Sequence, residues 1–320
     1  MGETFEPGAT VVPKPLHLLT GRELERKEQV AKVTTRVLRY LTGEFASRGF
    51  DWLLPVVFSK STDPLWPDPG ASIEKRVETE IYGEPVRTMH SMIIHKLVAS
   101  STAYPKLFVL SPNVRIERRE RKNTGWHSYE FTQLDFELRG AGSEDVRELV
   151  ETVVTGLVAH LKTTSDLPVS FDEREVMETP FEILDRRDLI TRHGHEWEQV
   201  LPQLISRPVW VTNIPREFYD YEDPATGRWD NYDLFVPYYG EILSGAKREW
   251  EHDRIVTKMN RDGVDQKNFS LLLGLSEEGR IKPSAGAGIG IERIVSWIVG
   301  AKHIGEVQPF PKVPGVVYDL

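Results

Sequence analysis

Segments with strand-like composition follow one another directly, separated by loops, and this order limits the possible folds more than any other feature of the sequence. The apolar, β-prone segments are residues 50–58, 107–111, 113–117, 129–139, 209–213, 232–236 and 241–243. Parallel strands need helical crossovers between them, whereas antiparallel strands can follow one another through turns and loops. The order therefore predicts an α+β fold with a mainly antiparallel sheet of six or seven strands, flanked by helices.

Apolar residues recur at helical spacing in five segments. In the first, Thr20 precedes Glu23 by three residues, which is a capping-box pattern, and the apolar stripe ends near Gly49. Residues 1–20 hold three prolines and little periodicity. We expect an N-terminal arm at 1–20 and a single domain over 21–320. The other four helical segments are residues 91–101, 144–162, 248–261 and 291–299.

The composition argues against several classes of function. The chain has no cysteine, so disulfides, thiolate nucleophiles and cysteine-ligated metals are excluded. A net charge of −9 gives no broad basic surface for nucleic acid. Neither a signal peptide nor a run of about 18 apolar residues is visible. We therefore expect a cytoplasmic protein that does not associate with membranes.

One predicted strand carries charged residues at alternate positions. Arg115 and Glu117 are two residues apart, so their side chains point to the same face of a strand. Aimed together into a cleft, they could hold a phosphate and the amine of a base. The alternative is an ion pair on the surface. The chain returns through His127, Phe131 and Gln133, of which Phe131 alone would be typical of a core residue.

Two acidic residues flank a predicted bend, and an arginine follows them. Asp233 and Glu241 are eight positions apart. Two carboxylates across a bend can share Mg²⁺ with nucleotide phosphates, and Arg248 could bind a carboxylate in a bidentate manner. The alternative is a solvated hairpin.

Two further segments bring a cation next to apolar or glycine-rich sequence. Residues 286–290 allow close approach of the backbone to a ligand, or close helix packing. Arg293 follows in the first turn of the last helix, where it could bind a triphosphate. Lys96 comes after the apolar stretch that begins at Ser91. Taken alone, Lys96 is expected to reach solvent with its ammonium group while its stem covers apolar surface.

Together, and in this order, these segments resemble the catalytic core of class II aminoacyl-tRNA synthetases, in the aspartyl/asparaginyl branch. Residues 114–135 resemble motif 2 of that family, and residues 286–293 resemble motif 3. Residues 48–55 resemble motif 1, which usually builds a dimer interface. The resemblance covers roughly residues 21–315 and implies a homodimer with the α+β fold predicted above.

The resemblance implies a role for each residue of a nucleotide site that uses ATP. Arg115 would hold the α-phosphate and the activated carboxylate, and Arg293 would hold the γ-phosphate. These two arginines would be the catalytic residues. Glu117 would bind the adenine amine, Phe131 would stack on the ring, and His127 would meet the phosphates.

The resemblance also implies a metal site and a substrate site. Asp233 and Glu241 would hold Mg²⁺. Lys96 and Arg248 would bind a substrate carboxylate, because two cations facing one small site suit a dicarboxylic amino acid. The substrate-binding residues would be Ser91, Lys96, Gln133 and Arg248.

Two departures from the synthetases shape the expected reaction. Only the arm and one helix precede Gly49, which is too little chain for a five-stranded anticodon-binding barrel, so tRNA is not an expected partner. His90, Ser91 and Lys96 resemble the HSxxxxK segment of asparagine synthetase A. We expect adenylation of aspartate followed by amidation with ammonia. The alternatives are a paralogue that activates an amino acid for transfer to a tRNA, carrier protein or amine, and a non-catalytic regulatory paralogue that binds an amino acid.

Overall fold

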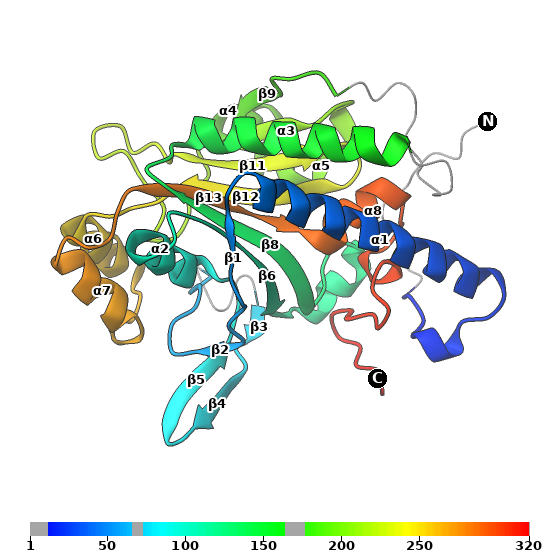
Figure 1. The fold of residues 1–320 in the computed structure, drawn as a ribbon, viewed down its shortest axis with the longest axis horizontal. Coiled ribbons are helices and arrows are strands. Elements are labelled where there is room, and N and C mark those ends of the chain that lie inside the picture. Colours follow the sequence, from blue (N-terminus) through cyan, green and yellow to red (C-terminus); the bar gives the residue numbers. More distant parts are fainter. Residues whose placement is uncertain (1–11, 66–72, 164–176, 320) are drawn as a thin grey trace.

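An eight-stranded sheet forms the centre of the protein (Figure 1). The computed structural model describes residues 12–65, 73–163 and 177–319. The central strands pair antiparallel, whereas the outermost pair at each edge is parallel. The mainly antiparallel α+β fold is confirmed, with eight strands instead of six or seven. The order across the sheet is β1 (Asp51–Trp52), β6 (Lys106–Val114), β8 (Glu130–Arg139), β13 (Ser284–Gly290), β12 (Gly240–Lys247), β11 (Asn231–Val236), β10 (Val209–Thr212) and β9 (Glu182–Asp185).

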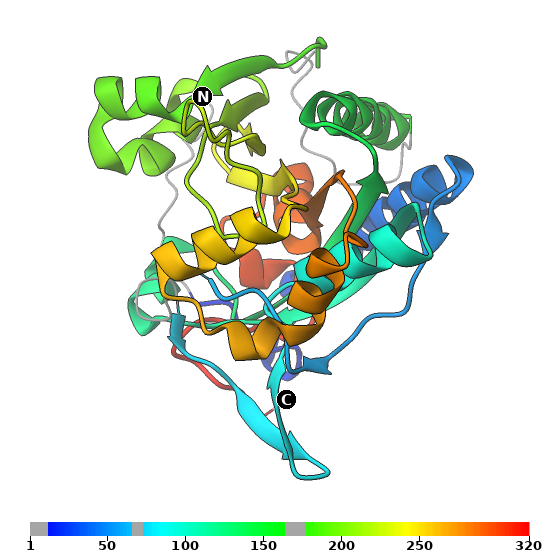
Figure 2. The same ribbon diagram turned by 90° about the vertical axis from the view of Figure 1, so that its left-hand side faces the viewer.

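Two small sheets accompany the large one. β2 (Phe58–Ser59), β5 (Glu84–Thr88) and β4 (Glu78–Ile81) form one, and β3 (Ile73–Lys75) pairs with β7 (Ile116–Glu117) in the other. The β4–β5 hairpin projects away from the body of the protein (Figures 1 and 2). All four residues of β4 are exposed. A strand of this kind does not need the alternation of apolar and polar residues that marks a half-buried strand, and the sequence therefore did not predict it.

Helices cover both faces of the large sheet. The helices α1 (Arg22–Ser47), α3 (Ser143–Lys162) and α8 (Ile291–Val299) share one apolar core with it, and α1 and α3 lie side by side (Figure 1). A second core joins α2 (Ile93–Thr102), α6 (His252–Asp262) and α7 (Ser270–Glu277). A third core packs α4 (Arg186–His193) and α5 (Trp197–Leu204) near β10. No helix among the described residues is both long and apolar enough to span a bilayer.

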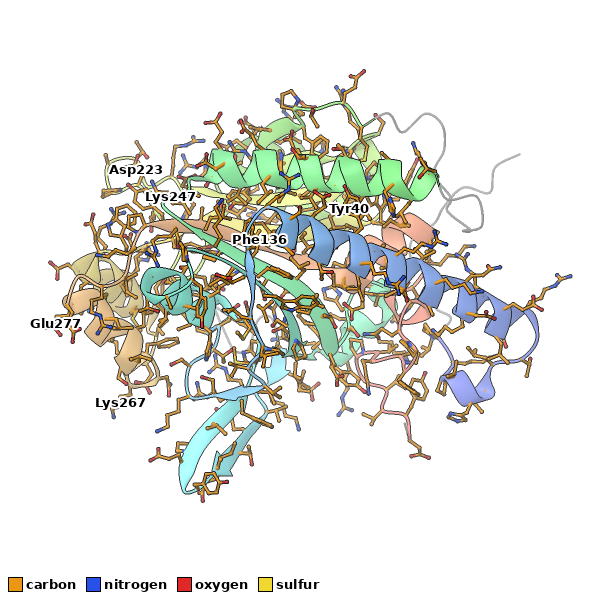
Figure 3. The ribbon with its side chains drawn as sticks, viewed as in Figure 1. Tyr40, Phe136, Asp223, Lys247, Lys267 and Glu277 are labelled. Carbon is orange, nitrogen blue, oxygen red and sulfur yellow. The ribbon has the colours of Figure 1, made fainter. Side chains whose placement is uncertain are left out.

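Strand β8 separates the main core from a polar face. Leu134 and Phe136 are fully buried in the core (Phe136 is labelled in Figure 3). The Phe136 ring lies 4.8 Å from the ring of Phe45 on α1. The alternate residues of the same strand therefore point to the opposite face of the sheet. Those residues are Gln133, Asp135 and Glu137.

Several sequence-based boundaries were wrong for local reasons. Residues 50–58 are not one strand, because only Asp51–Trp52 and Phe58–Ser59 are extended and paired, with Pro55 between them. In contrast, β6 continues through Pro112, since β1 pairs only with Leu107 and Phe108 and leaves β6 as an edge at that point. Half of the predicted capping box forms, with the Thr20 N–H donating to Glu23 Oε2 at 3.2 Å.

Candidate active site

Two adjoining cavities line the polar face of the sheet. One lies among the motif 2 and motif 3 segments, and the other, of about 250 Å³, lies beneath α2. Ten of the eleven residues singled out from the sequence line one cavity or both, and the exception is Asp233. The two cavities share residues at their junction, so the cleft is continuous. The shared residues are Arg115, Glu117, Gln133, Glu241 and Gly288.

The floor of the cleft is built by the pairing of β8 with β13. Gly286, Gly288 and Gly290 lie opposite Glu137, Asp135 and Gln133, respectively. A Cβ atom on Gly288 would lie 2.8 Å from Asp135 Oδ1 and 2.9 Å from Gln133 Nε2. The glycines thus leave room for the polar side chains of the neighbouring strand. Residues 284–290, which the sequence marked only as glycine-rich, form this central strand.

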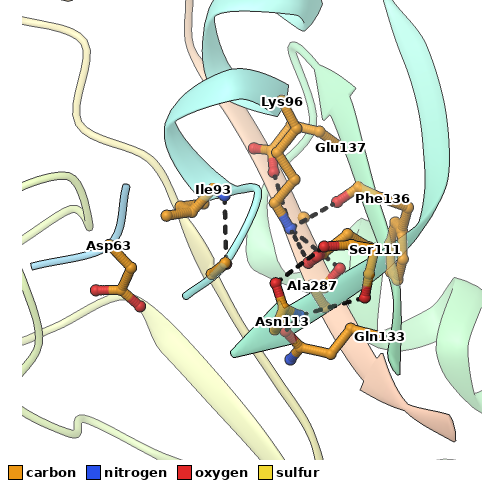
Figure 4. A network of polar contacts seen from close by, with 12 residues as sticks. Asp63, Ile93, Lys96, Ser111, Asn113, Gln133, Phe136, Glu137 and Ala287 are labelled. Carbon is orange, nitrogen blue, oxygen red and sulfur yellow. Dashed lines mark hydrogen bonds and ion pairs between the residues drawn. The ribbon is translucent and has the colours of Figure 1, made fainter. Parts of the chain in front are cut away.

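Lys96 enters the cleft from α2 and is buried, with 2% of its surface exposed. Its ammonium donates to Asp135 Oδ1 at 3.0 Å and to the carbonyl oxygens of Phe136 and Ala287 at 3.3 and 3.2 Å (Figure 4). Because an ammonium has three donors, this geometry uses all of them. The expectation that Lys96 reaches solvent is therefore wrong: the lysine points inward, where the acceptors of β8 and β13 lie.

Arg248 extends the same network from the end of β12. Its guanidinium forms an ion pair with Asp220, donates to Glu137 Oε1 at 3.3 Å and donates to the Gly286 carbonyl at 3.1 Å. Lys96 Nζ also lies 3.8 Å from Glu137 Oε2. Both cations are paired with carboxylates of the protein itself. The sequence-based argument that two unpaired buried cations would require a dicarboxylic substrate therefore does not hold.

The other cavity gathers the residues expected at the nucleotide. Arg115 donates to the His90 carbonyl at 3.1 Å, and its guanidinium lies 5.3 Å from the centre of the Phe131 ring. Glu117 is buried and paired with Arg121. Burial raises the pKa of the Glu117 carboxyl, and the neighbouring arginines oppose this rise. Arg115 and Glu117 therefore face one cleft instead of forming an exposed surface pair.

His127 and Arg293 lie at the far wall of this cavity. The His127 ring is 2.7 Å from the Thr124 hydroxyl. Burial, assisted by Arg293, Arg121 and Arg115, lowers the pKa of His127 to about 3, so the imidazole is neutral near pH 7. Arg293 donates to the Glu241 carbonyl at 2.8 Å and lies 3.3 Å from its carboxylate.

Asp233 and Glu241 occupy neighbouring strands of the sheet. Asp233 on β11 is bound by Arg216, and its other oxygen, Oδ1, is buried without a hydrogen-bond partner in the described part of the chain. Burial raises the pKa of Asp233 to about 7, Arg216 opposes this rise, and Glu241 adds to it. Within residues 12–65, 73–163 and 177–319, no group of three or more acidic, histidine or cysteine side chains could hold a metal by itself. Mg²⁺ needs only one or two carboxylates when phosphates supply other ligands, and of these two residues Glu241 is the one that lines both cavities.

Sequence reasoning missed several residues that line the cleft. Most of them come from the loop between β10 and β11, where the buried acidic residues Glu217 and Asp220 flank two buried aromatic residues. In the sequence, the available signal was a charged residue next to an aromatic residue. This pattern does not show which of the charged side chains face the cleft. The missed residues include Asp63, Arg121, Arg216, Glu217, Tyr219 and Asp220.

Comparison with known proteins identifies the family. Residues 24–314 match the model of the tRNA synthetases class II (D, K and N). The chain belongs to this family.

The relatives of this class II synthetase chain include asparagine–tRNA ligases. The ligase of Streptococcus agalactiae is 28% identical, over 90% of this chain and 69% of its own length. The asparaginyl-tRNA synthetase of Pyrococcus horikoshii, solved with asparaginyl-adenylate, has a TM-score of 0.78 and 23% identity, over 92% of this chain and 70% of that one. A putative aspartyl-tRNA synthetase from Leishmania major has a TM-score of 0.74 and 18% identity, over 91% of this chain and 66% of that one. These structures share the fold.

Family membership makes the chain an ATP-dependent ligase that activates an amino acid. The motif 2 and motif 3 resemblances thus belong to a true class II synthetase core. The expectation that tRNA is not a partner receives no support from these comparisons, because the relatives are themselves tRNA ligases.

Proposed function

We propose that this class II synthetase core adenylates aspartate with ATP and then amidates it with ammonia to give asparagine. The observation that carries the proposal is the pair of buried cations, Lys96 and Arg248, which both approach Glu137 in the cavity next to the nucleotide residues. Arg248 uses only three of its five N–H donors within the described structure, so it could also bind a substrate carboxylate in addition to the one that reacts.

The nucleotide half of the cleft supplies charge neutralisation. Arg115, at the junction of the two cavities, would hold the α-phosphate and the attacking carboxylate together. Arg293 would bind the γ-phosphate, and the neutral His127 could donate a hydrogen bond to a phosphate. Glu117 would accept from the adenine amine, and Phe131 would stack on the ring. In-line attack on the α-phosphorus needs little proton transfer, so positioning and electrostatics dominate.

Magnesium would sit between Asp233 and Glu241. The free oxygen of Asp233 and the carboxylate of Glu241, which lines both cavities, would be its protein ligands. The ion would neutralise the charge of the departing pyrophosphate.

Arg248 is the better direct ligand for the second carboxylate of aspartate. A guanidinium has five N–H donors, of which three are used in hydrogen bonds here. All three donors of Lys96 are engaged, so this residue would bind substrate by exchanging its longest bond, the one to the Phe136 carbonyl. Ser91 and Gln133 line the same cavity and would complete the substrate site.

The nitrogen donor would be free ammonia. No cysteine exists in the chain, so a cysteine-dependent release of ammonia from glutamine has no nucleophile here.

Mass analysis of the product formed from ATP, Mg²⁺, aspartate and ammonium tests the proposal directly. Asparagine and AMP are the expected products. Leucine in place of aspartate should give neither AMP nor an amide, and equal turnover with leucine would refute the dicarboxylate assignment.

A second candidate function is transfer of the activated amino acid to tRNA. The observation that favours it is the similarity to asparagine–tRNA ligases over 90% of the chain. Acid-stable labelling of tRNA by radioactive aspartate or asparagine would identify it, and labelling without formation of free asparagine would replace the first proposal.

We also propose that the protein is a homodimer. Apolar side chains are exposed around β1 and β2, within and just after the segment that resembles motif 1. They are Trp52, Leu54, Val57 and Phe58. Burial of such a patch against its own copy would give an isologous interface.

A further inference from the structure

One carboxylate in the amino-acid cavity forms no ion pair with a side chain of the described part of the protein. Glu217 follows β10 and lines this cavity, although only 9% of its surface is exposed. Its chain neighbour Arg216 is turned away onto Asp233. Among residues 12–65, 73–163 and 177–319, no other side chain forms a hydrogen bond or ion pair with the Glu217 carboxylate. A buried acceptor of this kind is costly unless a ligand satisfies it.

The remaining acidic residues of the cavity differ from Glu217 in this respect. Each of them lies within 3.7 Å of a cationic side chain. The pairs are Asp63–Arg115, Glu117–Arg121, Asp135–Lys96, Asp220–Arg248 and Glu241–Arg293. Glu217 is therefore the one acidic side chain lining this cavity that has no ion pair with a cationic side chain of the described residues.

Other acidic side chains lie near Glu217, and together they make this part of the cavity attractive to a cation. Burial and the nearby Asp63 carboxylate raise the pKa of Glu217 to about 8, Asp220 adds to this rise, and Arg216 opposes it. Burial, Asp63 and Glu217 likewise raise the pKa of Tyr219, which lines the same cavity. Asp63 also lies 3.7 Å from Arg115, so this acidic group adjoins the residue that would hold the reacting carboxylate.

Aspartate alone does not account for all of these acceptors. Its single ammonium can be bound by Asp135 Oδ2, a buried oxygen of the same cavity that has no hydrogen-bond partner in the described part of the chain, since Lys96 engages only Oδ1. A second nitrogen enters the proposed reaction as the attacking amine. We infer that Glu217 binds this amine as an ammonium ion and accepts its proton. The inference rests on the proposed function, and it assigns a binding site and a base to the second half-reaction.

Protons and electron pairs balance in the amidation step. The ammonium ion gives one proton to Glu217 and becomes ammonia, whose lone pair forms a bond to the carbonyl carbon of the aspartyl adenylate. The bond between that carbon and the phosphate oxygen then breaks, and its electron pair leaves with AMP. The nitrogen gives a second proton to the departing phosphate, and Glu217 releases its proton to water.

Glu217→Gln removes the ionisable carboxyl group and keeps the shape of the side chain, and three assays separate its effects. The first is aspartate-dependent exchange of pyrophosphate into ATP, which needs no amine. The second is amide formation from ammonium chloride. The third is hydroxamate formation from hydroxylamine, which is a neutral nucleophile near pH 7.5. We expect kcat/KM for ammonium to fall about 10²-fold, as for a lost general base. Exchange and hydroxamate formation should stay within about threefold of wild type.

Glu222→Gln is the matched control, because Glu222 lies five residues further along, outside the cavity, and is paired with Arg261. This variant should match the wild type in all three assays. If Glu217→Gln does not fold, Glu217→Asp provides the same comparison, with a raised KM for ammonium and unchanged exchange.

Two results would overturn the inference. A parallel loss of exchange, amide and hydroxamate in a folded variant would mean that Glu217 holds the amino acid instead of the amine. An unchanged kcat/KM for ammonium would mean that Glu217 binds no amine. Failure of the proposed function has a different signature, since the wild type itself would then form no amide from aspartate and ammonium.

Discussion

Gly288 lies directly opposite Asp135 in the ladder between β13 and β8, and Asp135 is in turn fixed by Lys96. A methyl group at residue 288 would come within 2.8 Å of Asp135 Oδ1. We predict that Gly288→Ala lowers the free energy of unfolding by about 1–3 kcal/mol, because the side chains of the floor must shift. Adenylation should fall as well. Urea denaturation and pyrophosphate exchange measure the two effects.

Gly274→Ala is the control for this substitution. Gly274 lies within α7, and a Cβ atom added there would meet no side chain and no other part of the protein within 4 Å beyond its own helix. Alanine there should stabilise the protein by about 0.5–1 kcal/mol. Equal effects of the two substitutions would contradict the role given to the glycine floor.

Arg115→Ala and Arg293→Ala should each abolish most adenylation while leaving the fold intact. Their side chains are 26% and 29% exposed and face the cleft. Loss of either positioned cation should cost about 2–4 kcal/mol of transition-state stabilisation, measured as kcat/KM for pyrophosphate exchange. The exposed Arg280 offers the control, since Arg280→Ala should leave exchange unchanged. Near-normal exchange in either cleft variant would refute its assigned role.

Lys96→Met should damage both stability and substrate binding. Removal of the ammonium leaves Asp135 buried without its partner, which should cost about 3–5 kcal/mol of unfolding free energy. The KM for aspartate should rise far more than the KM for ATP. The double variant Lys96→Met/Asp135→Asn should recover much of the stability without recovering aspartate binding. An unchanged aspartate KM in a folded variant would exclude Lys96 from the substrate site.

The wild type should be a dimer at micromolar concentration, and Leu54→Glu should shift it towards monomer. Leu54 is 88% exposed within the apolar patch near β1 and β2. A charge buried in an apolar interface is unfavourable, so dimerisation should weaken by at least about tenfold. Light scattering across a dilution series measures this. Leu204→Glu, at an exposed position on α5, should leave the mass unchanged.

His127 should contribute to the loss of stability in mild acid. Its pKa is about 3 in the folded protein, mainly because it is buried, and near 6.5 in an unfolded chain. As the pH falls below 6.5, the unfolded chain takes up a proton that the folded protein does not, so folding becomes less favourable. Between pH 7.5 and 5 this residue should cost about 2 kcal/mol.

His127→Gln should lack this part of the pH dependence. Its unfolding free energy should therefore decline less between pH 7.5 and 5 than that of the wild type in urea titrations. His195→Gln, at an exposed position, should keep the wild-type slope. Parallel profiles for wild type and His127→Gln would show that the histidine is not held neutral.

The sequence predicted the cleft better than it predicted the details of the sheet. Arg115, Glu117 and Arg293 were expected at a cleft from short local patterns, and all three line it, although Arg115 lies between β6 and β7 and not in one strand with Glu117. The direction of Lys96 could not be predicted, because apolar flanks are equally consistent with a side chain that reaches solvent. Only the acceptors on β8 and β13 draw it inward.

The loop that carries Glu217 shows why the rest of the site was missed. Its apolar residues follow neither helical nor strand periodicity. Glutamate and aspartate, as at positions 217 and 220, are residue types typical of exposed loops. Their burial depends on α2 and α6, which are remote in sequence and pack against Phe218 and Tyr219 in the same core. Strand β13 was missed for a different reason, since alternating glycine and alanine lack the large apolar residues typical of strands.

The glycine floor restricts how such a site can change its specificity over evolutionary time. At Gly286 and Gly288 any added side chain would collide with a neighbouring strand, so these floor positions offer almost no tolerated substitutions. New substrate preferences must therefore arise in the walls, on α2 and in the loop before β11, where residues carry side chains that can be exchanged. Related proteins that act on different substrates should share this floor and diverge at the positions equivalent to Lys96, Glu217 and Asp220.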